Sequence, residues 1–86
     1  MSWYVYIIET TTGKYYTGIT TDIERRFKEH CSSKKGAKFF RSNTPKKIIY
    51  SEEYENRSLA SKREWEIKQM SKAKKVELVH SSIGPS

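Results

Sequence analysis

The chain has 86 residues, with 17 Lys or Arg against 10 Asp or Glu, so its formal net charge is +7 at pH 7. A chain this short forms a single domain, residues 1–86, with a modest core and no room for a second domain. The positive charge is typical of a protein with a polyanionic partner, nucleic acid above all, but charge alone suits a merely basic and soluble protein equally well.

The N-terminal part of the chain predicts a β-hairpin. Two segments rich in β-branched and aromatic side chains predict strands, residues 3–9 and 14–20. A three-residue loop that ends in Gly13 suits a type I turn closed by a left-handed glycine. The resulting register pairs Tyr6 with Gly18 and places Tyr6 diagonal to Tyr16 on one face, with an open notch at the glycine.

A first helix is predicted next, capped by Thr21 or Asp22 and ending near Ser32. Its apolar stripe consists of Ile23, Phe27 and Cys31. We therefore expect Cys31 to be a small core residue. As the sole cysteine, it also excludes an internal disulfide and a paired-cysteine zinc motif.

Arg26 and His30 stand one helical turn apart at the edge of that apolar stripe. They could line a partly sheltered site. Alternatively, Arg26 extends its aliphatic stem over the core and His30 covers the core edge. Helical spacing alone leaves both interpretations open.

Residues 33–46 predict a basic loop punctuated by glycine and proline. Its cations could meet phosphates while a phenylalanine stacks on a base. The alternative is that a phenylalanine fills the core and the lysines only add solubility. The residues expected to bind nucleic acid are Lys34, Lys35, Lys38, Phe39 and Arg41.

The remaining elements are a third strand over residues 47–54, a helix from Asn56 or Ser58 to about Met70, and a helix from Ser71 over residues 72–80. Residues 82–86 are expected to form a disordered tail. The order is ββαβαα, which predicts an α+β fold. The second of the three helices is expected to bury one side: Leu59, Ala60, Ile67 and Met70.

Two glutamates lie on opposite flanks of this second helix, Glu64 and Glu66, so helical geometry alone does not choose between them. Either could simply form a surface ion pair. Arg63 falls inside the apolar stripe, and we expect it to meet a carboxylate or to bend outward.

Taken together, these residues resemble the GIY-YIG nuclease domain family over residues 3–79. Tyr4-Val5-Tyr6 resembles the first motif of the family, and Tyr16-Thr17-Gly18 resembles the second. The two lie at the expected ten-residue spacing. Tyr4 replaces the glycine of the first motif, and Thr17 replaces the isoleucine of the second. Within the family, the chain looks most like the small stand-alone bacterial branch of YhbQ-like proteins.

Later segments extend this resemblance. In the family, an arginine and a histidine follow on a helix, and they align with Arg26 and His30. The segment REWEIK resembles the family's later helix, which carries a metal-binding glutamate, and this puts that role on Glu64. The segment 36–38, GAK, and the Glu64-Trp65 pair are similar to the structure-specific resolvase branch. The resemblance implies a small three-stranded antiparallel sheet flanked by helices.

The resemblance also implies the catalytic residues, which are Tyr6, Tyr16, Arg26, His30 and Glu64. Glu64 would hold one Mg²⁺ or Mn²⁺, bound weakly without substrate because one carboxylate is a poor site alone. Tyr6 would be the general base or water positioner, provided that nearby positive charge favours its phenolate. Arg26 would bind the scissile phosphate, Tyr16 would orient water or phosphate, and His30 would shuttle a proton.

We therefore expect a metal-dependent endonuclease that acts on DNA in repair or recombination, with branched or nicked DNA as its candidate substrate. One alternative is a nucleic-acid-binding module without catalysis, which the lack of a second domain favours; another is a protein-interaction domain. No signal-peptide pattern or membrane-length apolar run is present, so we expect a cytoplasmic protein with no membrane partner. We also expect a monomer without a disulfide-linked partner.

Overall fold

A computed structural model describes residues 2–32 and 43–83 of the chain. The elements follow the predicted order, ββαβαα: β1 (Trp3–Thr10), β2 (Tyr15–Thr20), α1 (Ile23–Ser32), β3 (Pro45–Tyr54), α2 (Arg57–Lys68) and α3 (Lys72–Ile83). Because α3 ends at Ile83, it includes two residues of the expected tail, and residues 84–86 lie outside the described part. The five residues expected to bind nucleic acid, between Lys34 and Arg41, also lie outside it.

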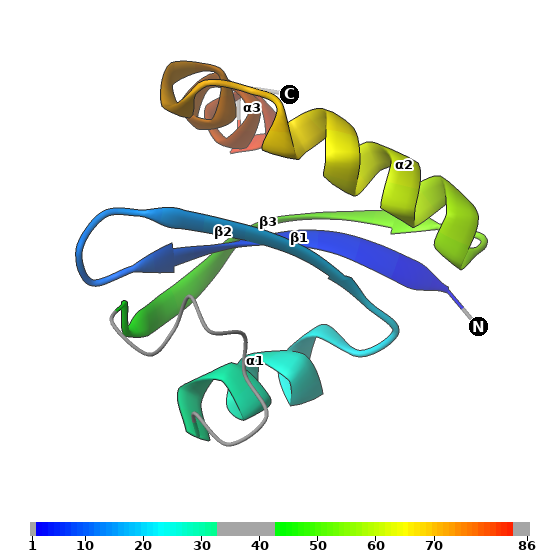
Figure 1. The fold of residues 1–86 in the computed structure, drawn as a ribbon, viewed down its shortest axis with the longest axis horizontal. Coiled ribbons are helices and arrows are strands. Elements are labelled where there is room, and N and C mark those ends of the chain that lie inside the picture. Colours follow the sequence, from blue (N-terminus) through cyan, green and yellow to red (C-terminus); the bar gives the residue numbers. More distant parts are fainter. Residues whose placement is uncertain (1, 33–42, 84–86) are drawn as a thin grey trace.

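The three strands form one antiparallel sheet in the order β2-β1-β3, as the resemblance implied. The predicted hairpin register is confirmed, since Tyr6 pairs with Gly18 and Ile8 pairs with Tyr16. Gly13 closes the turn with a φ of 81°, in the left-handed region that glycine enters without steric cost. Figure 1 shows α1 on one face of the sheet and α2 with α3 on the other.

The central strand β1 is buried on both faces, because successive side chains of a strand point to opposite sides. Val5 and Ile7 pack with a cluster that α2 and α3 cover. Tyr6 and Ile8 point to the α1 face, where Ile23 packs against them. The tyrosine of the first motif is therefore part of a core layer as well as a candidate catalytic group.

Side-chain caps fix where the helices begin. Asp22 caps α1, since its Oδ1 accepts a hydrogen bond from the Arg25 N–H at 3.1 Å. Asn56 caps α2 by accepting from the Leu59 N–H at 2.9 Å. The structure thus selects Asp22 over Thr21 and Asn56 over Ser58, and each such cap contributes about 1 kcal/mol.

Two residues expected in the core are exposed. Leu59 has 45% of its surface accessible because α2 packs through Ala60 and Ile67 instead. Cys31 is also exposed. In α1 the buried residue is instead His30, which precedes Cys31 in the chain. The helix is therefore rotated about its axis relative to the predicted apolar stripe.

Arg63 meets a carboxylate, as predicted. Its Nε lies 3.0 Å from Oε1 of Glu52 on β3. Tyr50 and Tyr54 donate hydroxyl hydrogen bonds to the same carboxylate. Burial alone would raise the pKa of Glu52, but the hydrogen bonds from Arg63 and the two phenols lower it. This cluster ties α2 to the sheet on the flank away from Glu64.

Within the described residues, none of the helices is both long and apolar enough to span a membrane. This agrees with the absence of a transmembrane pattern in the sequence.

Candidate functional site

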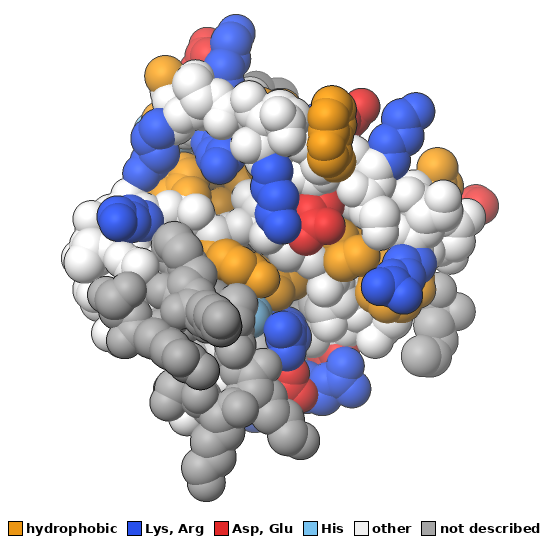
Figure 2. Space-filling model, in the orientation of Figure 1, with side chains coloured by type: hydrophobic (Ala, Val, Ile, Leu, Met, Phe, Trp, Pro, Cys, Tyr) orange, Lys and Arg blue, Asp and Glu red, His pale blue; other side chains and the backbone are white. Residues whose placement is uncertain are grey.

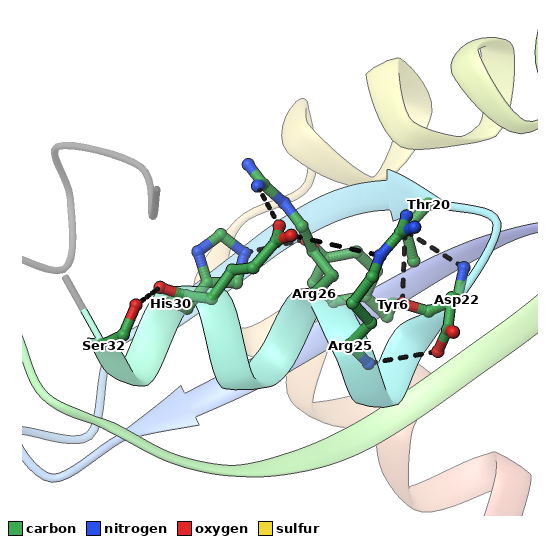
Figure 3. Close-up of polar contacts among 8 residues, drawn as sticks. Tyr6, Thr20, Asp22, Arg25, Arg26, His30 and Ser32 are labelled. Carbon is green, nitrogen blue, oxygen red and sulfur yellow. Dashed lines mark hydrogen bonds and ion pairs between the residues drawn. The ribbon is translucent and has the colours of Figure 1, made fainter. Parts of the chain in front are cut away.

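Tyr6 and His30 form the buried centre of the site. The Tyr6 hydroxyl lies 3.0 Å from Nε2 of His30, and each residue exposes only 1% of its surface. Tyr6 comes from the middle strand and His30 from the last turn of α1. Figure 3 shows both side chains meeting between the helix and the sheet.

Arg26 lies one turn before His30 and reaches the same hydroxyl. Its guanidinium lies close enough to the Tyr6 hydroxyl to lower the pKa of that phenol by hydrogen bonding and by charge. Another of its nitrogens, Nη1, lies 2.8 Å from Oε1 of Glu29. The hydrogen bond that Arg26 donates to Glu29 is the largest cause that raises the pKa of Arg26, so the guanidinium stays charged. Figure 3 shows Arg26 and His30 projecting from the same side of α1.

Tyr16 lies beside the Tyr6 and His30 rings. Its ring centroid lies 6.3 Å from that of Tyr6 and 5.2 Å from that of His30, with the last pair edge to face. Aromatic pairs prefer these arrangements, which fixes the rings relative to one another.

The notch expected at Gly18 is not open. A Cβ atom there would lie 2.7 Å from the Tyr6 hydroxyl oxygen and 2.9 Å from the adjacent ring carbon. The phenol of Tyr6 therefore occupies the space that the missing side chain leaves. Glycine is required here because the phenol lies so close to the backbone of β2.

Burial keeps both central groups uncharged. It raises the pKa of Tyr6 well above the usual value for tyrosine, and Tyr16 adds to the rise, while the hydrogen bond and charge of Arg26 oppose it. Burial and then the charge of Arg26 lower the pKa of His30 from 6.5 to about 4. The expectation that positive charge would favour a Tyr6 phenolate is therefore wrong for the free protein, because desolvation outweighs Arg26.

Glu64 approaches from α2. Its charge is among the causes that raise the pKa of Tyr6, so the carboxylate acts on that phenol from α2. Its Oε2 lies 3.3 Å from Nζ of Lys68. Glu66 instead lies 3.3 Å from Arg63, on the other flank. The geometry thus distinguishes two glutamates that helical spacing could not.

The surface around the site mixes charge and apolar groups. Figure 2 shows acidic, basic and hydrophobic side chains adjoining one another in the band between α2 and α1. A separate hollow of about 430 Å³ is lined by Glu9, Tyr15, Lys47, Ile48, Ile49, Val79 and His80. None of the five expected catalytic residues lines it. The candidate site is therefore a shallow face with a buried Tyr6–His30 pair beneath it.

The donor chemistry of this face fits a hard divalent ion. Glu64 supplies carboxylate oxygens, which Mg²⁺ and Mn²⁺ prefer. Across residues 2–32 and 43–83, no three or more His, Cys, Asp or Glu side chains gather as a metal site. A cation held by Glu64 would therefore take most of its ligands from water and from a substrate phosphate.

The structure brings Tyr6, Tyr16, Arg26 and His30 together, and the charge of Glu64 acts on Tyr6 from α2. Glu29 was not predicted as a site residue from the sequence, although it pairs with Arg26 in the structure. Its position three residues after Arg26 was the available signal, because such pairs are neighbours on a helix. The tight contact between Gly18 and Tyr6 was also missed, since sequence patterns do not show how far a phenol reaches.

The chain is similar to known proteins over most of its length. The family described as GIY-YIG catalytic domain matches residues 2–77. UPF0213 protein DP2720 of Desulfotalea psychrophila is 51% identical over 81 residues, which cover 94% of this chain and 74% of that protein. UPF0213 protein YhbQ of Escherichia coli K12 is 43% identical over 82 residues, covering 95% of this chain and 81% of YhbQ.

A solved structure is also similar. The solution NMR structure of the UPF0213 protein BH0048 from Bacillus halodurans shares 41% sequence identity and a TM-score of 0.63. The match covers 99% of this chain and 89% of the other. The similarity of fold therefore extends over nearly the whole chain.

Proposed function

This chain belongs to the GIY-YIG family of catalytic domains, which implies an endonuclease type of activity, and from this premise we propose that it is a metal-dependent endonuclease that hydrolyses DNA phosphodiester bonds in repair or recombination. The observation that supports the proposal is that His30 and Arg26 both act on the buried Tyr6 hydroxyl, and that the charge of Glu64 reaches the same phenol. A structural core would have no need for three polar groups at this point. Phosphodiester hydrolysis requires a phosphate ligand, a proton acceptor and a cation site.

Arg26 is proposed to bind the scissile phosphate. Its planar guanidinium presents donors in a fork that matches two phosphate oxygens. Glu29 holds one nitrogen at 2.8 Å, which fixes the direction of the remaining donors. The guanidinium charge would stabilise the negative charge that grows on the phosphate oxygens as the nucleophile attacks.

Tyr6 and His30 are proposed to accept the proton of the attacking water together. As the Tyr6 oxygen takes a proton from water, its own proton passes to Nε2 of neutral His30, 3.0 Å away. The phenol therefore never has to become a free phenolate, which burial disfavours. A phosphate near Arg26 would offset the positive charge that lowers the pKa of His30, and so would help the imidazole to hold the proton.

Tyr16 and Glu64 complete the assignment. Tyr16 borders the Tyr6 and His30 rings and is proposed to orient the water or a phosphate oxygen. Glu64 is proposed to hold one Mg²⁺ or Mn²⁺, which would supply charge for the leaving oxygen. Lys68 competes for the same carboxylate in the free protein, so we expect weak cation binding until a phosphate arrives.

A second candidate function is a DNA-binding module without catalysis. Two charged groups of the site already have partners, since Arg26 pairs with Glu29 and Glu64 pairs with Lys68. A binder would retain this arrangement unchanged, whereas a nuclease must exchange part of it for phosphate and metal. The two functions thus differ in whether Glu64 matters for cleavage.

Glu64→Gln tests the proposal, with Glu66→Gln as its matched control on the same helix. Both variants remove one charge and retain size, but Glu66 lies on the Arg63 flank. Plasmid and branched DNA are incubated with each protein, with and without Mg²⁺ or Mn²⁺. We expect cleavage by the wild type and by Glu66→Gln, loss of at least about 100-fold in Glu64→Gln, and no cleavage with a chelator.

Equal DNA binding by all three proteins with no cleavage by the wild type would support the binding module instead. Cleavage by Glu64→Gln at the wild-type rate would contradict the metal assignment.

A further inference from the structure

Trp65 is the most conspicuous apolar side chain on the surface. It exposes 65% of its area and follows Glu64 directly on α2. The other tryptophan, Trp3, packs against the core, and the guanidinium of Arg57 lies 5.6 Å from its ring centroid. In the part of the chain that the structure describes, neither an aromatic ring nor a cation covers Trp65 in this way. Trp65 is thus a large flat surface left open to solvent.

The position of Trp65 on the helix separates it from the core. Ala60 and Ile67 are the buried residues of α2, and at about 100° per residue Trp65 lies on the opposite side. Removing its side chain should therefore leave the packing of α2 unchanged. The indole has no structural task that would explain a tryptophan at this position.

Basic side chains flank the indole. Lys62 and Lys68 stand three residues before and three residues after Trp65, the spacing of neighbours on a helix surface. Both lysines are exposed, and Nζ of Lys68 also lies 3.3 Å from Oε2 of Glu64. An aromatic face between two cations suits a nucleotide, whose base stacks while its phosphates meet the charges.

From these observations we propose that Trp65 stacks on an unpaired base next to the phosphate that is cleaved, so that the protein selects DNA with a single-stranded segment over intact duplex. The bases of an intact duplex are stacked on one another and offer no face to an indole. An unpaired base at a flap or junction does offer one. This inference rests on the proposed nuclease function for its location beside the scissile phosphate.

A protein partner fits this surface less well. Leu59, the other exposed large apolar residue in the described segments, lies about 120° around α2 from Trp65, so the two do not form one patch. Protein interfaces of ordinary size need a broader apolar centre that is depleted of lysine. A single indole bordered by lysines favours a nucleic acid.

The test compares binding of two DNA molecules in the presence of a chelator, so that cleavage does not interfere. One is a duplex with a single-stranded flap, and the other is a fully paired duplex with the same number of phosphates. We expect Trp65→Ala to weaken flap binding about ten-fold or more, because stacking is lost, and to leave duplex binding unchanged. Trp65→Phe should restore part of the loss.

Leu59→Ala is the matched control, since it removes an exposed apolar side chain from the same helix, and it should bind both molecules as the wild type does. Thermal unfolding should give the same midpoint for Trp65→Ala as for the wild type. An unchanged affinity of Trp65→Ala for the flap, or an equal loss on both molecules, would overturn the proposal.

The readout also separates this inference from the proposed function. Cleavage by the wild type, combined with unchanged flap binding by Trp65→Ala, would reject the stacking role and leave the nuclease intact. Flap binding that depends on Trp65, without any cleavage by the wild type, would reject the nuclease and support the stacking role.

Discussion

The hydroxyl of Tyr6 lies 3.0 Å from Nε2 of His30, although 24 residues separate them in the chain. This contact joins the central strand of the sheet to the end of α1 at a point that is shielded from water. Arg26 acts on the same hydroxyl, so the oxygen lies between a neutral imidazole and a guanidinium. A group held in this way is ready for proton transfer without rearrangement.

We expect Tyr6→Phe to lower the cleavage rate at least about 100-fold, because it removes the group that takes the proton from water. It should also reduce the free energy of unfolding by about 1–3 kcal/mol, since a buried nitrogen of His30 loses its partner. Cleavage assays and urea unfolding measure the two effects. Tyr15→Phe, whose residue packs with the cluster on the opposite face of the sheet, is the control and should cleave normally. Wild-type cleavage by Tyr6→Phe would refute its role.

The stability of the fold should depend on pH through His30. Its pKa is about 4 in the folded chain, whereas histidine in the unfolded chain has the ordinary value of 6.5. Between these two pH values the unfolded chain therefore binds more protons than the folded chain. The contribution of neutral His30 is therefore fully present above pH 6.5 and is lost as the pH falls toward about 4. The loss should reach about 3 kcal/mol.

The pH dependence is measured by urea unfolding between pH 7 and pH 4 for the wild type and His30→Gln. Carboxylates also titrate near the lower limit, so the difference between the two proteins isolates the histidine. We expect the stability of His30→Gln to fall less steeply than that of the wild type, whereas His80→Gln, which alters an exposed histidine, should follow the wild type. Parallel curves for the wild type and His30→Gln would show that His30 does not titrate in this range.

Gly18→Ala should displace the Tyr6 phenol, because the added Cβ would lie 2.7 Å from its oxygen. We expect a loss of about 1–3 kcal/mol in the free energy of unfolding, which is typical of overpacking, together with a loss of cleavage. The double variant Gly18→Ala with Tyr6→Phe provides the control, since it removes the closest of the clashing atoms.

In that double-mutant cycle, Gly18→Ala should destabilise the Tyr6→Phe background less than it destabilises the wild type. Equal effects in the two backgrounds would mean that the hydroxyl is not what requires the glycine.

Local sequence patterns accounted for much of the architecture. The turn at Gly13, the hairpin register and the order of elements were predictable because each depends on neighbouring residues and on alternation along a strand. The pairing of Arg63 with a carboxylate was also predictable, because an unpaired charge cannot lie in an apolar stripe. The exposure of Leu59 and Cys31 was not, since it depends on how each helix is rotated against the sheet.

The sequence by itself determined which chemical groups are available and which strands and helices carry them, because residue types and short-range spacing are local properties. Only the tertiary structure decided that Tyr6 contacts His30, that Glu64 pairs with Lys68 while Glu66 pairs with Arg63, and that burial keeps the phenol protonated. These outcomes depend on the rotation of α1 and α2 over the sheet and on the exclusion of water between them. The spacing of residues along the chain determines neither the rotation of these helices nor the exclusion of water.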